Sequence, residues 1–141
     1  NPGEPAKPIA KIASGGELSR IMLAIQTVLS AHDDLDTMIF DEVDTGISGS
    51  AAQKVGLKLH EVSKYAQVIC ITHLAQIACL ADYHLLIQKQ VTNHKTYTQV
   101  IPLSKEAQTK EIARMIGGEA ITPLLLQNAQ EMIDSAKQLK A

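Results

Sequence analysis

The stretch Thr37-Met38-Ile39-Phe40-Asp41-Glu42-Val43-Asp44-Thr45-Gly46-Ile47 decides how this chain folds. Its first four residues are mostly apolar and run directly into two adjacent carboxylates, and a third acid and a glycine follow. This pattern is typical of a short buried strand that ends abruptly in polar groups. In open α/β sheets, ligands bind just past the carboxyl ends of the strands. We therefore expect Asp41 and Glu42 at such an edge, where their oxygens suit magnesium and an anionic substrate.

The composition is that of one domain with an aliphatic core, because the chain has 141 residues, 45% hydrophobic and only 3% aromatic. The formal net charge is −2, so no overall basic character indicates nucleic acid binding. We find no apolar run of about 18 residues and no signal-peptide pattern, which predicts a soluble, cytoplasmic protein without a membrane partner. Cys70 and Cys79 stand in apolar surroundings, which favours buried free thiols.

The N-terminal part is expected to be an extended lead-in over residues 1–13, which hold three of the five prolines, followed by a helix to about residue 31. Ser14 and Glu17 have the spacing of a capping box at the start of that helix. Two glycines beside the cap leave bare backbone amides, which favours an anion site, although a plain cap is the simpler alternative. The helical spacing predicts a buried stripe of Leu18, Ile21, Met22, Ile25, Val28 and Leu29.

A second helix is predicted over residues 51–64, capped by Ser48 or Ser50, with an inner stripe of Ala52, Val55, Leu59 and Val62. A second buried strand follows at residues 67–71 and ends in Thr72 and His73. The order strand, helix, strand predicts a right-handed crossover with parallel pairing. Both strands would then deliver polar residues to one edge, with His73 joining the two carboxylates.

The C-terminal half is predicted to contain a short helix at 74–80 and an antiparallel hairpin of residues 83–90 and 96–103 around a polar loop. Two helices follow, one over 104–115 that ends at a glycine pair and one that starts at Thr122-Pro123. The last helix has a stripe of Leu125, Ala129, Met132, Ala136 and Leu139. The predicted fold class is α/β, with parallel strands, flanking helices and a β-hairpin.

Several kinds of site fit the residues poorly. Cys70, His73, Cys79 and His84 match no standard zinc spacing, and no G-x-S-x-G elbow indicates a serine hydrolase. Phosphoryl transfer fits better, with Asp41 holding magnesium, Glu42 polarising a water and His73 contacting the terminal phosphate. The chain nevertheless contains no G-x-x-x-x-G-K-[ST] segment, so the predicted site lacks a phosphate-cradling loop.

Three segments in order, SGGELSR at 14–20, TMIFDEVD at 37–44 and ITH at 71–73, resemble the C-terminal half of an SMC-like ABC-type ATPase head, which is part of a P-loop NTPase. Within that family the resemblance is to bacterial proteins of DNA double-strand-break repair and recombination. It implies that Asp41 is the Walker B magnesium residue, Glu42 the catalytic base and His73 the switch histidine.

The resemblance also implies a site shared between two protomers. Ser14, Gly15, Gly16 and Glu17 match the signature motif, which contacts the γ-phosphate of ATP held by the opposite protomer. Asp44, Gly46 and Ser48 match the D-loop, which crosses the dimer interface. Other members of the family usually carry an aspartate at the position of Ser48, so the role of Ser48 across the interface is left open.

The whole protein is accordingly expected to be a nucleoid-associated, magnesium-dependent ATPase. Its heads would form a homodimer around ATP, and it would act on double-stranded DNA ends. Residues 1–141 would be a single lobe without the N-terminal Walker A lobe and the coiled coil. We expect this lobe alone to leave ATP and Mg²⁺ largely unbound and to be inactive. The alternatives are a head of another SMC or transporter ATPase and a non-catalytic interaction module.

Overall fold

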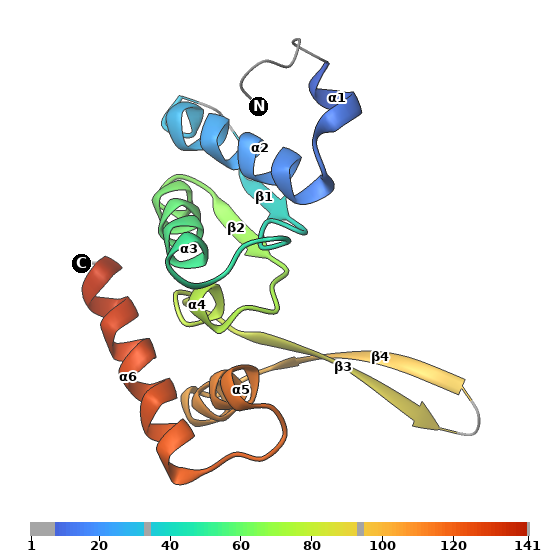
Figure 1. The fold of residues 1–141 in the computed structure, drawn as a ribbon, viewed down its shortest axis with the longest axis vertical. Helices are drawn as coiled ribbons and strands as arrows, with labels where there is room; N and C mark the ends of the chain where they lie inside the picture. The colour runs from blue at the N-terminus through green and yellow to red at the C-terminus, as the bar shows by residue number, and fades with distance from the viewer. Residues whose placement is uncertain (1–7, 33–34, 93–94, 141) are drawn as a thin grey trace. The chain divides into compact units, whose positions relative to one another are not determined.

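A computed structural model describes residues 8–32, 35–92 and 95–140, which form two compact units that divide after Thr72. Within these ranges the first unit contains helices α1 to α3 and strands β1 and β2, and the second contains α4 to α6 and β3 and β4 (Figure 1). The predicted α/β class is confirmed.

The first unit is built around a parallel strand pair, β1 (Thr37–Phe40) and β2 (Gln67–Cys70). Helix α3 (Gly49–Ser63) connects the two strands and packs against β2, so the predicted parallel crossover is confirmed. The register pairs Met38 with Val68 and Phe40 with Cys70 on one face. The carboxyl ends of both strands therefore lie at one edge of the sheet, as expected from the sequence.

The prediction that both strands are buried is wrong for one face of the pair. Met38 and Phe40 are buried, but Ile39 is 67% exposed and its partner Ile69 is 42% exposed. Successive side chains of a strand point to opposite faces. Within the first unit only one face of the sheet is covered, so the other leaves its isoleucines in contact with solvent.

Two expectations for the N-terminal part are also corrected. Residues 1–7 of the expected lead-in lie outside the described residues, and Ile9–Ile12 forms the short helix α1 rather than an extended segment. Pro8 precedes this helix as its N-cap, where the fixed φ of proline is compatible with a helix start. No proline interrupts the following residues, so one helical turn can form.

Helix α2 (Gly15–Leu29) has the predicted position but not the predicted burial. All members of the predicted stripe are between 40% and 74% exposed; they are Leu18, Ile21, Met22, Ile25, Val28 and Leu29. Helix α2 instead buries Gly16 and Leu23 and packs against α3. In α3 the predicted stripe is largely confirmed, because Ala52, Leu59 and Val62 are buried. The periodicity of α2 marks an apolar face that the first unit leaves uncovered.

The second unit begins with the one-turn helix α4 (Ala75–Ala78), which is shorter than predicted, and continues into the antiparallel hairpin of β3 (Leu85–Thr92) and β4 (Lys95–Pro102). The strands reach further into the predicted polar loop, of which residues 93 and 94 lie outside the described ranges. Figure 1 shows the hairpin as a long two-stranded ribbon. Its exposed apolar residues include Ile87, Val91 and Val100.

Helices α5 (Lys105–Gly117) and α6 (Pro123–Lys140) complete the second unit and pack against each other. The buried residues of α6 are Ala129, Ile133 and Ala136, so the predicted stripe is right at Ala129 and Ala136 but omits Ile133, and Leu139 is 50% exposed. The free thiol of Cys79 is buried as predicted, and that of Cys70 is half-buried. Over the described residues no helix combines the length and the apolar character that a membrane span requires.

Candidate functional site

The segment after β1 turns back sharply at Glu42. The Oδ1 atom of Asp41 accepts a hydrogen bond of 2.8 Å from the amide of Glu42, and the amide of Thr45 donates to the carbonyl of Glu42 at 3.0 Å. Glu42 has a φ of 57°, the only positive φ of a non-glycine residue in the described part of the chain. This left-handed conformation costs a β-carbon-bearing residue about 1–2 kcal/mol, so surrounding contacts must hold it.

The start of α2 has the capping box that the sequence predicts. The Ser14 hydroxyl accepts from the Glu17 amide at 3.3 Å, and Oε2 of Glu17 accepts from the Ser14 amide at 2.8 Å. The hydrogen bond from the Ser14 backbone, with a second from its hydroxyl, lowers the pKa of Glu17. Helix geometry gives the first amides, those of Gly15 and Gly16, no acceptor within the helix. The helix start is therefore ordered and retains amides that can face an anion.

Gly15 and Gly16 pack against the segment that carries the carboxylates. A Cβ placed on Gly15 would collide with Oε2 of Glu42. A Cβ on Gly16 would lie 2.9 Å from the carbonyl oxygen of Glu42 and 2.9 Å from Cβ of Thr45. Glycine is thus required sterically at position 16, where the contact is with main chain, and the Glu42 carboxylate lies at the N-terminal end of α2. The predicted signature segment and the predicted base are neighbours within this one chain.

Two residues that sequence reasoning missed attach α2 to the same segment. Oγ of Ser19 donates to the Asp41 carbonyl at 2.8 Å. Nη1 of Arg20 donates to the carbonyls of Val43 at 3.2 Å and Thr45 at 2.7 Å. Both donors stand on the same helix face as Gly16, at i+3 and i+4, and this spacing is the sequence signal that could have indicated them.

Asp44 connects the segment after β1 to Thr72, which follows the end of β2. Its side chain is 3% exposed, and its Oδ2 accepts a 2.6 Å hydrogen bond from the Thr72 hydroxyl. Burial, together with the carboxylates of Asp44 and Asp41, raises the pKa of the Cys70 thiol to about 12. The thiol therefore stays protonated at neutral pH. Asp44 ties the end of β1 to the end of β2.

The other predicted site residues are exposed. Gly46 has a φ of 76° in the loop after Asp44, a conformation that glycine adopts without strain. Ser48 is the N-cap of α3 by position, but its side chain makes no capping hydrogen bond. His73 is exposed and is the first residue of the second unit. The structure thus brings Gly15 and Gly16 next to Glu42, and the role of His73 stays a prediction.

The described residues hold no cluster of three or more histidine, cysteine, aspartate or glutamate side chains that could enclose a metal ion. Magnesium often takes only one or two protein carboxylates and completes its shell with water and substrate phosphates. A single aspartate at this edge is therefore chemically compatible with a magnesium–nucleotide complex.

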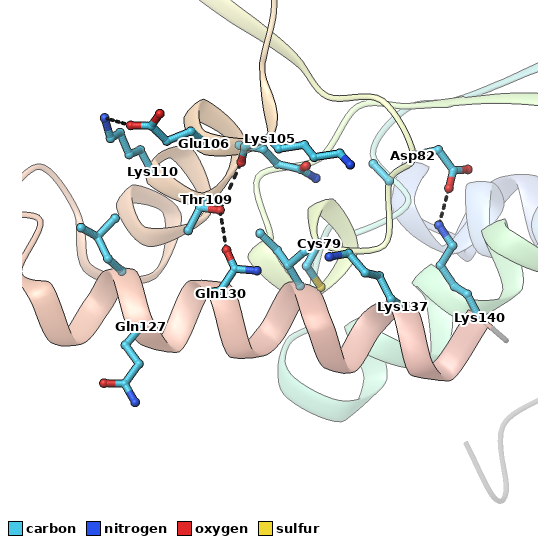
Figure 2. Close-up of a pocket in the computed structure, with 14 residues that line it drawn as sticks. Cys79, Asp82, Lys105, Glu106, Thr109, Lys110, Gln127, Gln130, Lys137 and Lys140 are labelled. Atoms are coloured by element: carbon cyan, nitrogen blue, oxygen red, sulfur yellow. Dashed lines mark hydrogen bonds and ion pairs between the residues drawn. The ribbon is translucent and has the colours of Figure 1, made fainter.

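The second unit has a groove of about 820 Å³ between α5, α6 and the segment after α4 (Figure 2). Lysines line it, but most of them are ion-paired: Lys110 with Glu106, Lys137 with Asp134 and Lys140 with Asp82. Since these ammonium groups already have counter-charges, the groove offers little to a phosphate. The anion-related features of the chain are those of the first unit.

Comparison with known proteins identifies the relatives of this chain, although no protein-family model matches it. The chain is 51% identical over 140 residues to the DNA repair protein RecN of Bacillus subtilis and 48% identical over 133 residues to that of Treponema pallidum. These alignments cover 99% and 94% of the chain. The chain is homologous to part of RecN. It spans only about a quarter of these relatives, 24% and 23% of their lengths.

The fold has a solved counterpart. A structure from work on ATP-driven dimerization and DNA-stimulated activation of SMC ATPases matches with a TM-score of 0.54. The match covers 84% of this chain and 70% of the other at 24% identity, so it concerns the fold. The RecN relatives confirm the resemblance on which the sequence predictions rest, and the SMC ATPase structure confirms the fold.

Proposed function

We propose that this chain is the C-terminal lobe of an ATP-hydrolysing head in a RecN-like protein of DNA double-strand-break repair and recombination. The observation that carries the proposal is the left-handed Glu42, with its carboxylate against Gly15 at the N-terminus of α2. ATP hydrolysis uses a base for water and donors for the terminal phosphate, and in a head dimer Glu42 would serve the ATP of its own head while the start of α2 would serve that of the partner head. The RecN relatives support the repair role.

Asp41 and Glu42 have separate tasks in this proposal. Asp41 would hold Mg²⁺ directly or through water, and the bound ion would neutralise phosphate charge. Glu42 would accept a hydrogen bond from the attacking water and so orient it toward the terminal phosphate. His73, which follows β2, would contact that phosphate.

The segments Ser14–Glu17 and Asp44–Ser48 would meet a second copy of the head. The amides at the start of α2 would receive the terminal phosphate of ATP bound to the partner head. Asp44 is buried against Thr72, so it would shape the segment from within, while the exposed Gly46 and Ser48 would face the partner. The solved SMC ATPases, which dimerise with ATP, support a head dimer of this kind.

The uncovered apolar surface of the first unit supports a further partner, the N-terminal Walker A lobe of the same protein. The outer face of α2 and the face of the strand pair with Ile39 and Ile69 are both exposed. Exposed apolar faces of this kind are typical of interaction sites. The lobe would supply the phosphate loop that this sequence lacks, and the complete protein would engage double-stranded DNA ends.

The decisive experiment compares ATP hydrolysis by this chain alone and by the chain fused to an N-terminal lobe with a Walker A motif. We expect hydrolysis only in the fusion. Glu42→Gln keeps the size of the side chain and should lower kcat by about 10²- to 10⁴-fold, the usual contribution of a general base. The matched control Glu106→Gln changes an exposed glutamate of α5 and should leave kcat unchanged. An active fusion that tolerates Glu42→Gln would remove Glu42 from this role.

A further inference from the structure

Helix α2 touches the carboxylate segment through one continuous face over its first two turns. Gly16, Ser19 and Arg20 are spaced i, i+3 and i+4 and lie on one side of the helix. Each contacts the backbone of residues 41–45: Gly16 by close approach, Ser19 by one hydrogen bond and Arg20 by two. Helix α2 therefore contacts backbone atoms of residues 41–45, which cannot rotate away as side-chain atoms could.

These hydrogen bonds flank Glu42 on both sides. Ser19 binds the carbonyl of the preceding residue, Asp41, and Arg20 binds the carbonyls of Val43 and Thr45. A positive φ in a residue with a β-carbon persists only where its surroundings determine it. Both Arg20 hydrogen bonds come from one nitrogen, Nη1, whose two hydrogens have fixed directions in the plane of the guanidinium group, whereas an ammonium group is a point charge without that geometry.

We infer that Ser19 and Arg20 are positioning residues that hold Glu42 in its left-handed conformation and couple it to the start of α2. The inference rests on the proposed function and deepens it. The helix that would receive a phosphate at Ser14 is the same rigid element that fixes the backbone of the base. A displacement of the helix start is then transmitted to the Glu42 carboxylate through about two turns of helix. The Glu42 carboxylate is oriented for the attacking water when α2 has the position seen in this structure, and it loses that orientation when α2 moves.

The test is steady-state ATP hydrolysis by the full-length protein with Arg20→Lys, which keeps the charge but loses the planar group that directs two Nη1 hydrogens at the carbonyls of Val43 and Thr45. We expect kcat to fall about tenfold, the loss expected when a charged hydrogen bond is weakened, while KM changes less than about twofold. Ser19→Ala should give a smaller loss of kcat, about threefold, because it removes one neutral hydrogen bond. The matched control Arg114→Lys alters an arginine of α5 that is paired with Glu111 and should change neither constant.

Hydrogen exchange in the same full-length variants separates positioning from other roles. In Arg20→Lys the amides of residues 41–47 should exchange faster, while those of α3 keep their wild-type rates. Wild-type kcat in Arg20→Lys, in a protein where Glu42→Gln abolishes hydrolysis, would overturn the inference and leave the proposed function standing. A loss of kcat without faster exchange at residues 41–47 would also overturn it. Hydrolysis that persists in Glu42→Gln would instead contradict the proposed function itself.

Discussion

Helices α2 and α3 belong to the same unit and have the same length, 15 residues, yet they use their apolar stripes in opposite ways. Helix α3 buries Leu59 and Val62 against the unit, whereas α2 exposes Ile21, Ile25 and their neighbours. The N-cap is well satisfied in the helix with the exposed stripe, where Ser14 forms a capping box, and not in the other, where the Ser48 side chain makes no capping hydrogen bond. The helix with the better-defined start is thus the one with the uncovered face. An apolar stripe predicts which face of a helix can pack, but it does not predict whether that face is covered within the same chain.

The largest expected effect tests the difference in burial. Leu59→Ala, at a side chain that is 6% exposed, should lower the free energy of unfolding of the 141-residue chain by about 2–5 kcal/mol, because a cavity remains. Ile25→Ala, at a side chain that is 45% exposed, should lower it by less than about 1 kcal/mol. Urea denaturation followed by circular dichroism measures both. Equal losses would mean that α2 buries its stripe within the chain in solution.

A smaller effect tests the difference between the two N-caps. Ser14→Ala removes the hydroxyl of the capping box and should cost about 1 kcal/mol in the free energy of unfolding. Ser48→Ala should cost little, since the Ser48 side chain accepts no hydrogen bond from the helix. The same denaturation experiment gives both values, and a loss of similar size at Ser48 would show that the caps are equivalent.

The smallest effect is the pH dependence of that difference. Hydrogen bonds from Ser14 lower the pKa of Glu17 in the folded chain below its ordinary value of 4.5. The stabilisation from the ionised carboxylate is therefore present above the unfolded-state pKa and is lost as the pH falls through the lower, folded-state pKa. The effect of Ser14→Ala should shrink over this acidic range, whereas that of Ser48→Ala should stay constant. An NMR titration of the Glu17 carboxyl that gives an unshifted pKa would contradict the expectation.

Local signals in the sequence predict local features of this fold well. The serine and glutamate three positions apart predict the capping box at Ser14, and the order strand, helix, strand predicts the parallel pairing of β1 with β2. The acidic edge after Phe40 follows from the same topology. Each of these depends on residues that are close in the chain or on a rule of chain connection, so one sequence suffices.

Features that depend on tertiary contacts could not be predicted in the same way. The apolar run Met38–Phe40 predicts a strand that is buried on both faces, and it does not reveal that only one face of the two-stranded sheet is covered and that Ile39 is exposed. The positive φ of Glu42 and the hydrogen bonds of Ser19 and Arg20 arise from the packing of α2 on a segment more than twenty residues away. Glutamate gives no local signal for a left-handed backbone, because glycine and asparagine are the residues that favour it.

The parallel pairing of β1 and β2 has a consequence for the order of folding. Thr37 pairs with Gln67, thirty residues further along the chain, whereas Thr92 pairs with Lys95, only three residues further along. The entropy cost of closing a long loop must be met before the contacts between its ends stabilise the chain. Strand pairs of high contact order therefore form slowly. We expect the hairpin of the second unit to form early and the edge with Asp41 and Glu42 to be completed late, after α3 has folded. Until then the positions of the Asp41 and Glu42 carboxylates relative to each other and to α2 are not fixed.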